Sequence, residues 1–198
     1  WQALTDHDTH AGLAEAAAAC REKGIRWMAG AEWSLGWNKR EWHVLGLNVD
    51  PHAPSIRALE LSQQQARERR ARLIGERLDQ AARMSGSYAK ACELAGSVAP
   101  GRPLFARVLM AEGKVRDMNH AFNRYLRPGQ SAFVATPWAS LADGIAAIRA
   151  AGGVAVLAHP QHYDLTRTKL RQLLTDFCAA GGQGIEVAMP GLTAHQSN

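Results

Sequence analysis

The sequence has few cysteines and no long apolar segment. Its three cysteines, Cys20, Cys92 and Cys178, are far apart and form no Cys-x-x-Cys pair, so we expect buried free thiols in a reducing cytoplasm. No apolar run approaches the roughly 20 residues that a membrane-spanning helix needs. These features argue against a disulfide framework and a transmembrane helix.

The composition supports a folded core and one strongly basic region. The 198 residues, 46% of them hydrophobic, suit one domain with an insertion or part of a longer domain. Residues 57–127 hold 14 Lys/Arg and 7 Asp/Glu, a net charge of +7, whereas the remainder carries −2. This region is either a solvated helical surface or a face for an anionic substrate such as phosphate or nucleic acid.

The hydrophobic periodicity predicts an α/β fold. Short apolar runs indicate strands at 1–5, 25–32, 41–47, 153–158 and 184–187, and helical patterns cover 9–23, 55–83, 141–151 and 169–180. Shorter helical segments follow to residue 127, after which the α/β pattern resumes at 131–134. We therefore expect a first α/β part (1–54), a helical insertion (55–130) and a second α/β part (131–198).

Four residues of types that bind divalent metals lie in or at the ends of these predicted strands. They are His7 in Thr5-Asp6-His7-Asp8-Thr9, Glu32 in Gly30-Ala31-Glu32, His43 in Trp42-His43-Val44, and His159 in Ala158-His159-Pro160. Barrel-type folds gather their chemistry at one end of parallel strands. The pattern therefore predicts a metal site in which Glu32 can bridge two ions.

Each of these residues also has a simpler interpretation. Asp8 or Thr9 could cap a helix, leaving His7 on the surface. Glu32 could form a salt bridge, and His43 could be a hydrogen-bonded core histidine. His159 follows an apolar strand, where an ionisable group is costly unless it is paired or bound to metal, so pairing with another side chain is its simpler interpretation. Asp6 and Asp8 could support the metal ligands by hydrogen bonding. His162 could contact the substrate. We expect the remaining histidines to be exposed: His10, His52, His120 and His195.

In their order and spacing these motifs resemble those of the polymerase and histidinol phosphatase (PHP) superfamily. The chain is most similar to the bacterial branch of 3′,5′-nucleoside bisphosphate phosphatases, which includes ribonuclease AM-like enzymes. Further matches to that branch are Gly101–Gly129, Tyr163-Asp164 and Gly181–Val187. The resemblance covers nearly the whole chain.

The resemblance implies a distorted (β/α)₇ barrel with two or three divalent ions, Mn²⁺ before Mg²⁺ or Zn²⁺. It implies that His7, Glu32, His43 and His159 are metal ligands, and that Asp6, His7, Glu32 and His159 serve catalysis. A metal-activated water would attack the phosphorus of a 3′,5′-nucleoside bisphosphate or a short 5′-phosphorylated RNA. The basic insertion would hold the second phosphate through Arg102 and Arg124, unless these are surface charges. A cytoplasmic enzyme with no membrane or protein partner is expected.

Some features depart from the PHP pattern. The N-terminal His-x-His and the C-terminal Asp-x-His are absent, so we expect a barrel incomplete at both termini, with weak metal binding and little activity. Gln161 and His162 stand where relatives often carry Arg, and Leu104 where they often carry His. The alternatives are a histidinol-phosphate phosphatase and a non-catalytic nucleic-acid-binding domain of PHP type.

Overall fold

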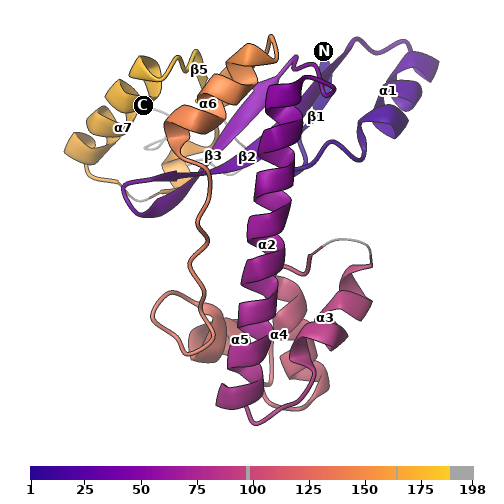
Figure 1. Cartoon of the computed structure of the whole chain (residues 1–198), viewed down its shortest axis with the longest axis vertical. Coiled ribbons are helices and arrows are strands. Elements are labelled where there is room, and N and C mark those ends of the chain that lie inside the picture. Colours follow the sequence, from indigo (N-terminus) through magenta and orange to yellow (C-terminus); the bar gives the residue numbers. More distant parts are fainter. Residues whose placement is uncertain (97–98, 164, 188–198) are drawn as a thin grey trace. The chain divides into compact units, whose positions relative to one another are not determined.

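The computed structural model describes residues 1–96, 99–163 and 165–187 (Figure 1). The chain divides into two compact units. The sheet unit comprises Trp1–Gln63 and Trp138–Asn198, and the helical unit comprises Gln64–Pro137. Asp164 and His195, which the sequence analysis named, lie outside the described residues.

The sheet unit contains a five-stranded mixed sheet in the order β1-β2-β3-β4-β5. Pairing is parallel for β1 with β2 and β4 with β5, and antiparallel for β2 with β3 and β3 with β4. The α/β prediction is confirmed, and β3 runs antiparallel to both of its neighbours. The sheet built from the described residues is open rather than closed into a barrel. The strands are β1 (Gln2–Leu4), β2 (Trp27–Trp37), β3 (Arg40–Leu47), β4 (Val154–Leu157) and β5 (Gly184–Ile185).

The hairpin of β2 and β3 determines which side chains share a face. β2 extends to Trp37, beyond the predicted strand end at Glu32, because Asn38 and Lys39 form a tight turn with φ of 47° and 60°. Positive φ at both central residues is typical of the type I′ turn, whose twist matches that of the two strands it connects. Glu32 is therefore an interior residue of β2, and the prediction that it ends a strand is wrong.

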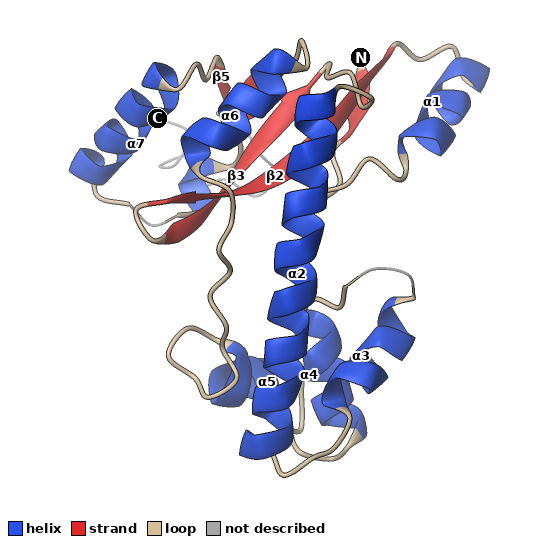
Figure 2. Ribbon diagram, viewed as in Figure 1, coloured by secondary structure: helices blue, strands red, loops and turns tan. Residues whose placement is uncertain are grey.

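One face of the sheet carries the apolar core. Trp33 and Leu35 of β2 lie opposite Val44 and Trp42 of β3, and all four are fully buried. Figure 2 shows α6 lying across the strands, with its Gly144 against β2: a Cβ there would lie 2.3 Å from Leu35 Cδ2. The helices that join this core are the start of α2 (Pro54–Ala81), α6 (Leu141–Ala150) and α7 (Arg167–Ala179).

The opposite face presents Glu32, Ser34 and His43, since alternate residues of a strand point to opposite sides. α1 (Leu13–Glu22) packs beside β1 and β2. A short 3₁₀ helix, Pro160–His162, follows β4. The apolar packing of one face thus leaves the polar residues of β2 and β3 on the other.

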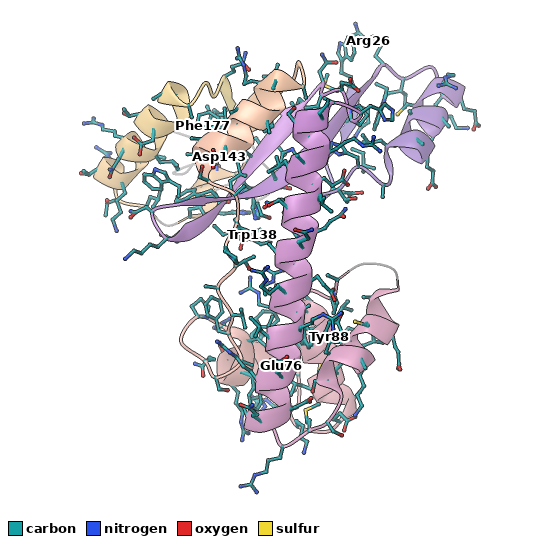
Figure 3. All side chains as sticks on the ribbon, viewed as in Figure 1. Arg26, Glu76, Tyr88, Trp138, Asp143 and Phe177 are labelled. Carbon is teal, nitrogen blue, oxygen red and sulfur yellow. The ribbon has the colours of Figure 1, made fainter. Side chains whose placement is uncertain are left out.

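The helical unit has its own core, formed by the end of α2 and the helices after it. Tyr88 packs against α2 (Figure 3), where a Cβ at Gly75 would lie 2.6 Å from its Cβ. The Tyr88 hydroxyl donates to Glu68, and Arg72 lies 4.7 Å above the ring. The other elements are α3 (Ser87–Ala95), α4 (Arg102–Ala111), α5 (Met118–Ala121) and the π-helical turn η1 (Phe122–Leu126).

Two sequence expectations about buried residues need correction. Residues 131–134 form no strand; Ala132 and Val134 instead join the core of the helical unit. The three cysteines are free, but Cys20 alone of them is buried, Cys92 is half-buried and Cys178 is exposed. Within the described ranges, no helix combines the length and hydrophobicity needed to cross a membrane.

Candidate metal centre

Three histidines from distant parts of the chain, His7, His43 and His159, converge on the carboxylate of Glu32. Its Oε1 lies 3.0 Å from His43 Nδ1 and 2.8 Å from His159 Nε2, and these two nitrogens are 3.2 Å apart. Its Oε2 lies 3.9 Å from His7 Nε2. The four residues that the sequence analysis selected therefore meet at one point, and their metal ligation stays a prediction.

Backbone pairing brings His7 to this point. Glu32 N donates to Asp6 O at 3.1 Å, and Asp8 N donates to Glu32 O at 2.9 Å. The loop after β1 thus continues the parallel pairing of β1 with β2 by one bridge, between His7 and Glu32. His159 follows β4 with a φ of 32°, and its N–H donates to the Glu186 carboxylate at 2.6 Å.

Asp8 anchors the His7 loop. Its side chain is 1% exposed and accepts hydrogen bonds from Ser34 N at 2.7 Å, Ser34 Oγ at 2.9 Å and Gln63 Nε2 at 3.2 Å. The helix-cap interpretation is wrong for Asp8, because α1 begins after Gly12 with no side-chain cap. Asp6, by contrast, is exposed.

The local charges shift two pKa values strongly. Burial alone would raise the pKa of Glu32, but hydrogen bonds from His43 and His159 and the charge of His7 lower it to about 2. Burial alone would lower the pKa of His43, yet its hydrogen bonds to Glu32 and Glu41 raise it to about 9. Near neutral pH, an ionised carboxylate therefore faces a protonated imidazole.

The donor atoms fit a divalent cation. His43 Nδ1, His159 Nε2 and Glu32 Oε1 form a triangle with sides of 2.8, 3.0 and 3.2 Å. Atoms that share a cation at about 2.0–2.2 Å, in octahedral or tetrahedral arrangement, lie roughly 2.8–3.5 Å apart. His7, Glu32 and His43 also offer one ligand atom each within 4.8 Å of one another. Imidazole and carboxylate donors suit Zn²⁺ and Mn²⁺.

Sequence reasoning missed two groups beside His43. Glu41 Oε1 lies 3.3 Å from His43 Nε2, and Glu41 Oε2 accepts from Trp138 Nε1 at 2.7 Å. The Tyr163 hydroxyl accepts from His43 N at 2.9 Å, and burial raises the pKa of this tyrosine. The spacing Glu41-x-His43 was an available signal, since residues two apart on a strand share a face.

The predicted substrate residues lie in different places. His162 is exposed, with its ring centre 5.2 Å from that of His159. Arg102 and Arg124 belong to the helical unit, where they lie over the rings of Phe133 at 6.0 Å and Tyr125 at 5.3 Å. Their contact with phosphate stays a prediction.

The expectation for the other histidines is wrong in part. The side chain of His10 is 8% exposed, because its Nδ1 lies 3.2 Å from Glu60 Oε2 and its ring packs 5.3 Å from Trp33. His52 is exposed as expected, and His120 is half-buried. The partner of His10 lies 50 positions away, which is why local sequence gave no sign of it.

Comparison with known proteins shows clear relatives, although no family model matches the chain. A 3′,5′-nucleoside bisphosphate phosphatase of Chromobacterium violaceum is 45% identical over 189 residues, covering 94% of this chain and 65% of that protein. A 5′-3′ exoribonuclease of Haemophilus influenzae is 45% identical over 195 residues, covering 98% and 70%. The 5′-3′ exoribonuclease Rnm of Escherichia coli is 37% identical over 188 residues, covering 94% and 64%.

Two solved structures are also similar. One is described as an amidohydrolase of Chromobacterium violaceum with bound sulfate and no metal; it has 43% identity and a TM-score of 0.88, covering 98% of this chain and 69% of that one. The other, described as a metal-dependent phosphoesterase of Bifidobacterium adolescentis, has 30% identity and a TM-score of 0.82 with the same coverage. The fold and the His/Glu cluster thus define a protein of the metal-dependent phosphoesterase class.

Within that class, the chain belongs to the family of 3′,5′-nucleoside bisphosphate phosphatases and 5′-3′ exoribonucleases. It spans about two thirds of the length of these relatives: 65% of the bisphosphate phosphatase and 70% of the Haemophilus influenzae exoribonuclease.

Proposed function

We propose that this chain provides a metal centre for hydrolysing a phosphate from 3′,5′-nucleoside bisphosphates and short 5′-phosphorylated RNA. The observation that carries the proposal is the placement of the Glu32 carboxylate, whose two oxygens face different imidazoles. Oε1 faces His43 and His159, and Oε2 faces His7. The names of the relatives, a bisphosphate phosphatase and exoribonucleases, support the substrate class.

The four converging residues would hold two or three divalent ions, with Mn²⁺ the first choice and Mg²⁺ or Zn²⁺ the others. Glu32 Oε1 with the two histidines from β3 and the β4 turn supplies one set of ligands, and Glu32 Oε2 with His7 supplies another. Bound ions would polarise a phosphate oxygen and lower the pKa of a bound water.

Other residues of the chain would handle the substrate. Asp6 lies exposed on the same loop as His7, and an exposed carboxylate there can accept a proton from the attacking water. His162, with its ring near that of His159, would contact the reacting phosphate. Arg102 and Arg124 would bind the second phosphate, because guanidinium groups form bidentate hydrogen bonds with phosphate.

The wider architecture stays a proposal as well. We propose that the sheet belongs to a distorted (β/α)₇ barrel whose parts lie at 1–54 and 131–198, with a helical insertion at 55–130. The similarity of 98% of the chain to two larger solved structures supports this assignment. We further propose a cytoplasmic location.

A substrate comparison tests the proposed function. The full-length protein, loaded with Mn²⁺, should release phosphate from a 3′,5′-nucleoside bisphosphate with a higher kcat/KM than from histidinol phosphate. The reverse preference would support the histidinol-phosphate alternative. Binding of RNA without phosphate release from any substrate would support the non-catalytic alternative.

A further inference from the structure

We propose that Glu41 is a positioning residue for His43, and that Trp138 holds Glu41 in place for this task. The proposal rests on the proposed metal centre, since it concerns how His43 is prepared as a ligand. Neither Glu41 nor Trp138 is among the residues that converge on Glu32.

The two nitrogens of His43 face opposite partners. Nδ1 lies toward Glu32 and His159, at 3.0 and 3.2 Å. Nε2 lies 3.3 Å from Glu41 Oε1. Glu41 and His43 are two residues apart on β3, so both side chains project from the same face of the strand. The ring therefore points one nitrogen into the site and the other at a carboxylate.

This arrangement selects one form of the imidazole. A histidine that binds metal through Nδ1 must carry its remaining proton on Nε2. A carboxylate that accepts this proton fixes the tautomer and the ring plane, and it makes the opposite nitrogen a better donor to metal. Glu41 is placed to do this for His43.

Trp138 limits where the Glu41 carboxylate can point. The Glu41 side chain is 36% exposed, so water could draw its carboxylate away from His43. The Trp138 indole N–H, donating to Oε2 at 2.7 Å, opposes that movement while leaving Oε1 for the imidazole. Trp138 is labelled in Figure 3 and is the first residue of the sheet unit after the helical unit.

The same sheet unit offers a matched control. Trp37 donates its indole N–H to the Asp176 carboxylate, also at 2.7 Å, so its hydrogen bond has the same chemistry and length. Trp37 lies at the far end of β2 from Glu32, roughly 16 Å away at about 3.3 Å per residue. Variants of Trp37 and Asp176 therefore measure the effect of losing an indole–carboxylate hydrogen bond that involves neither Glu41 nor His43.

The experiment combines Mn²⁺ titration with NMR of the His43 ring. The variants are Glu41→Gln, Trp138→Phe, their double variant, and the controls Trp37→Phe and Asp176→Asn. We expect Glu41→Gln to weaken Mn²⁺ binding about 10- to 100-fold, as loss of such a supporting carboxylate does. Trp138→Phe should weaken it less, the double variant should match Glu41→Gln, and the controls should match the wild type.

The NMR measurement separates this proposal from the metal centre itself. In the metal-free wild type, the His43 Nε2 proton should exchange slowly with water, and Glu41→Gln should accelerate that exchange. If the wild type binds no metal but shows this protected proton, the proposed function fails and the positioning role stands. Unchanged exchange and unchanged Mn²⁺ affinity in a folded Glu41→Gln variant would overturn the positioning role. If Trp138→Phe weakens Mn²⁺ binding by the same factor in the wild type and in the Glu41→Gln variant, Trp138 does not act through Glu41, and its proposed role is overturned.

Discussion

The Glu32 and His159 side chains meet at 2.8 Å although 127 positions separate them in the sequence. Glu32 projects from the middle of β2, and His159 lies in the turn after β4, two strands away in the sheet. β3 lies between them and adds His43 to the same carboxylate oxygen. This contact makes the site dependent on the order and pairing of three strands.

Without metal, the charges at this site should give the chain a stability optimum at mildly acidic pH. The folded pKa of Glu32 is lowered from 4.5 to about 2, so its contribution is present above pH 4.5 and is lost as the pH falls toward 2. The pKa of His43 is raised from 6.5 to about 9, so its contribution is present below pH 6.5 and is lost as the pH rises through 9. Thermal unfolding in chelator should show the highest Tm between about pH 4.5 and 6.5.

The variant His43→Gln identifies the source of the alkaline decline. It should flatten the fall in Tm between about pH 6.5 and 9, whereas His52→Gln, at an exposed position, should leave that fall unchanged. An identical alkaline decline in His43→Gln would show that another group titrates there.

Removal of the Asp8 carboxylate should both destabilise the protein and weaken metal binding. Asp8→Ala leaves the buried Ser34 N–H and hydroxyl without this acceptor, which should reduce the free energy of unfolding by about 2–4 kcal/mol. The His7 loop would also lose its anchor. Urea unfolding and Mn²⁺ titration measure the two effects. Asp50→Ala is the control, because Asp50 accepts a hydrogen bond from His52 N in an exposed turn; equal losses in both variants would contradict the anchoring role.

Gly144 should be essential for the packing of α6 on β2. In an exposed helix Gly→Ala stabilises by about 1 kcal/mol, but here the new methyl group would meet Leu35 Cδ2 at 2.3 Å. We expect Gly144→Ala to destabilise the protein by about 1–3 kcal/mol in urea unfolding. Ala146→Gly, at an exposed position of the same helix, should cost about 1 kcal/mol from helix propensity. A stabilised Gly144→Ala variant would show that the contact relaxes freely.

The arginines of the helical unit should discriminate between substrates. If Arg102 and Arg124 bind the second phosphate, alanine at either position should reduce kcat/KM for a bisphosphate by roughly 10- to 150-fold, from about 1.5–3 kcal/mol per charged hydrogen bond. A generic monophosphate ester should be affected far less. Arg116→Ala, with a side chain 84% exposed, is the control. Equal losses on both substrates would place the arginines in folding or general electrostatics.

The sequence predicted the site residues better than it predicted the strand boundaries and the long-range partners around them. Strand-like runs that contain His, Glu and His were enough to select residues that do converge. β2 was predicted too short, because the apolar run was taken to end at Glu32 and the residues up to Trp37 were left out of the strand. The partners Glu41 and Trp138 are 97 positions apart, and no local pattern encodes such a contact. Residues 131–134 resembled the resumed α/β pattern because they are mostly apolar, but Ala132 and Val134 are buried in the core of the helical unit instead.

The proposed centre depends most on Glu32, because its carboxylate faces all three histidines. Calorimetric titration of the chain with Mn²⁺ tests this dependence, with Glu32→Gln as the variant and Glu22→Gln as the control, since Glu22 is an exposed partner of Lys23 on α1. We predict saturable Mn²⁺ binding by the wild type and by Glu22→Gln, and its loss in Glu32→Gln. Binding by Glu32→Gln with the affinity of the wild type would contradict the proposed metal centre.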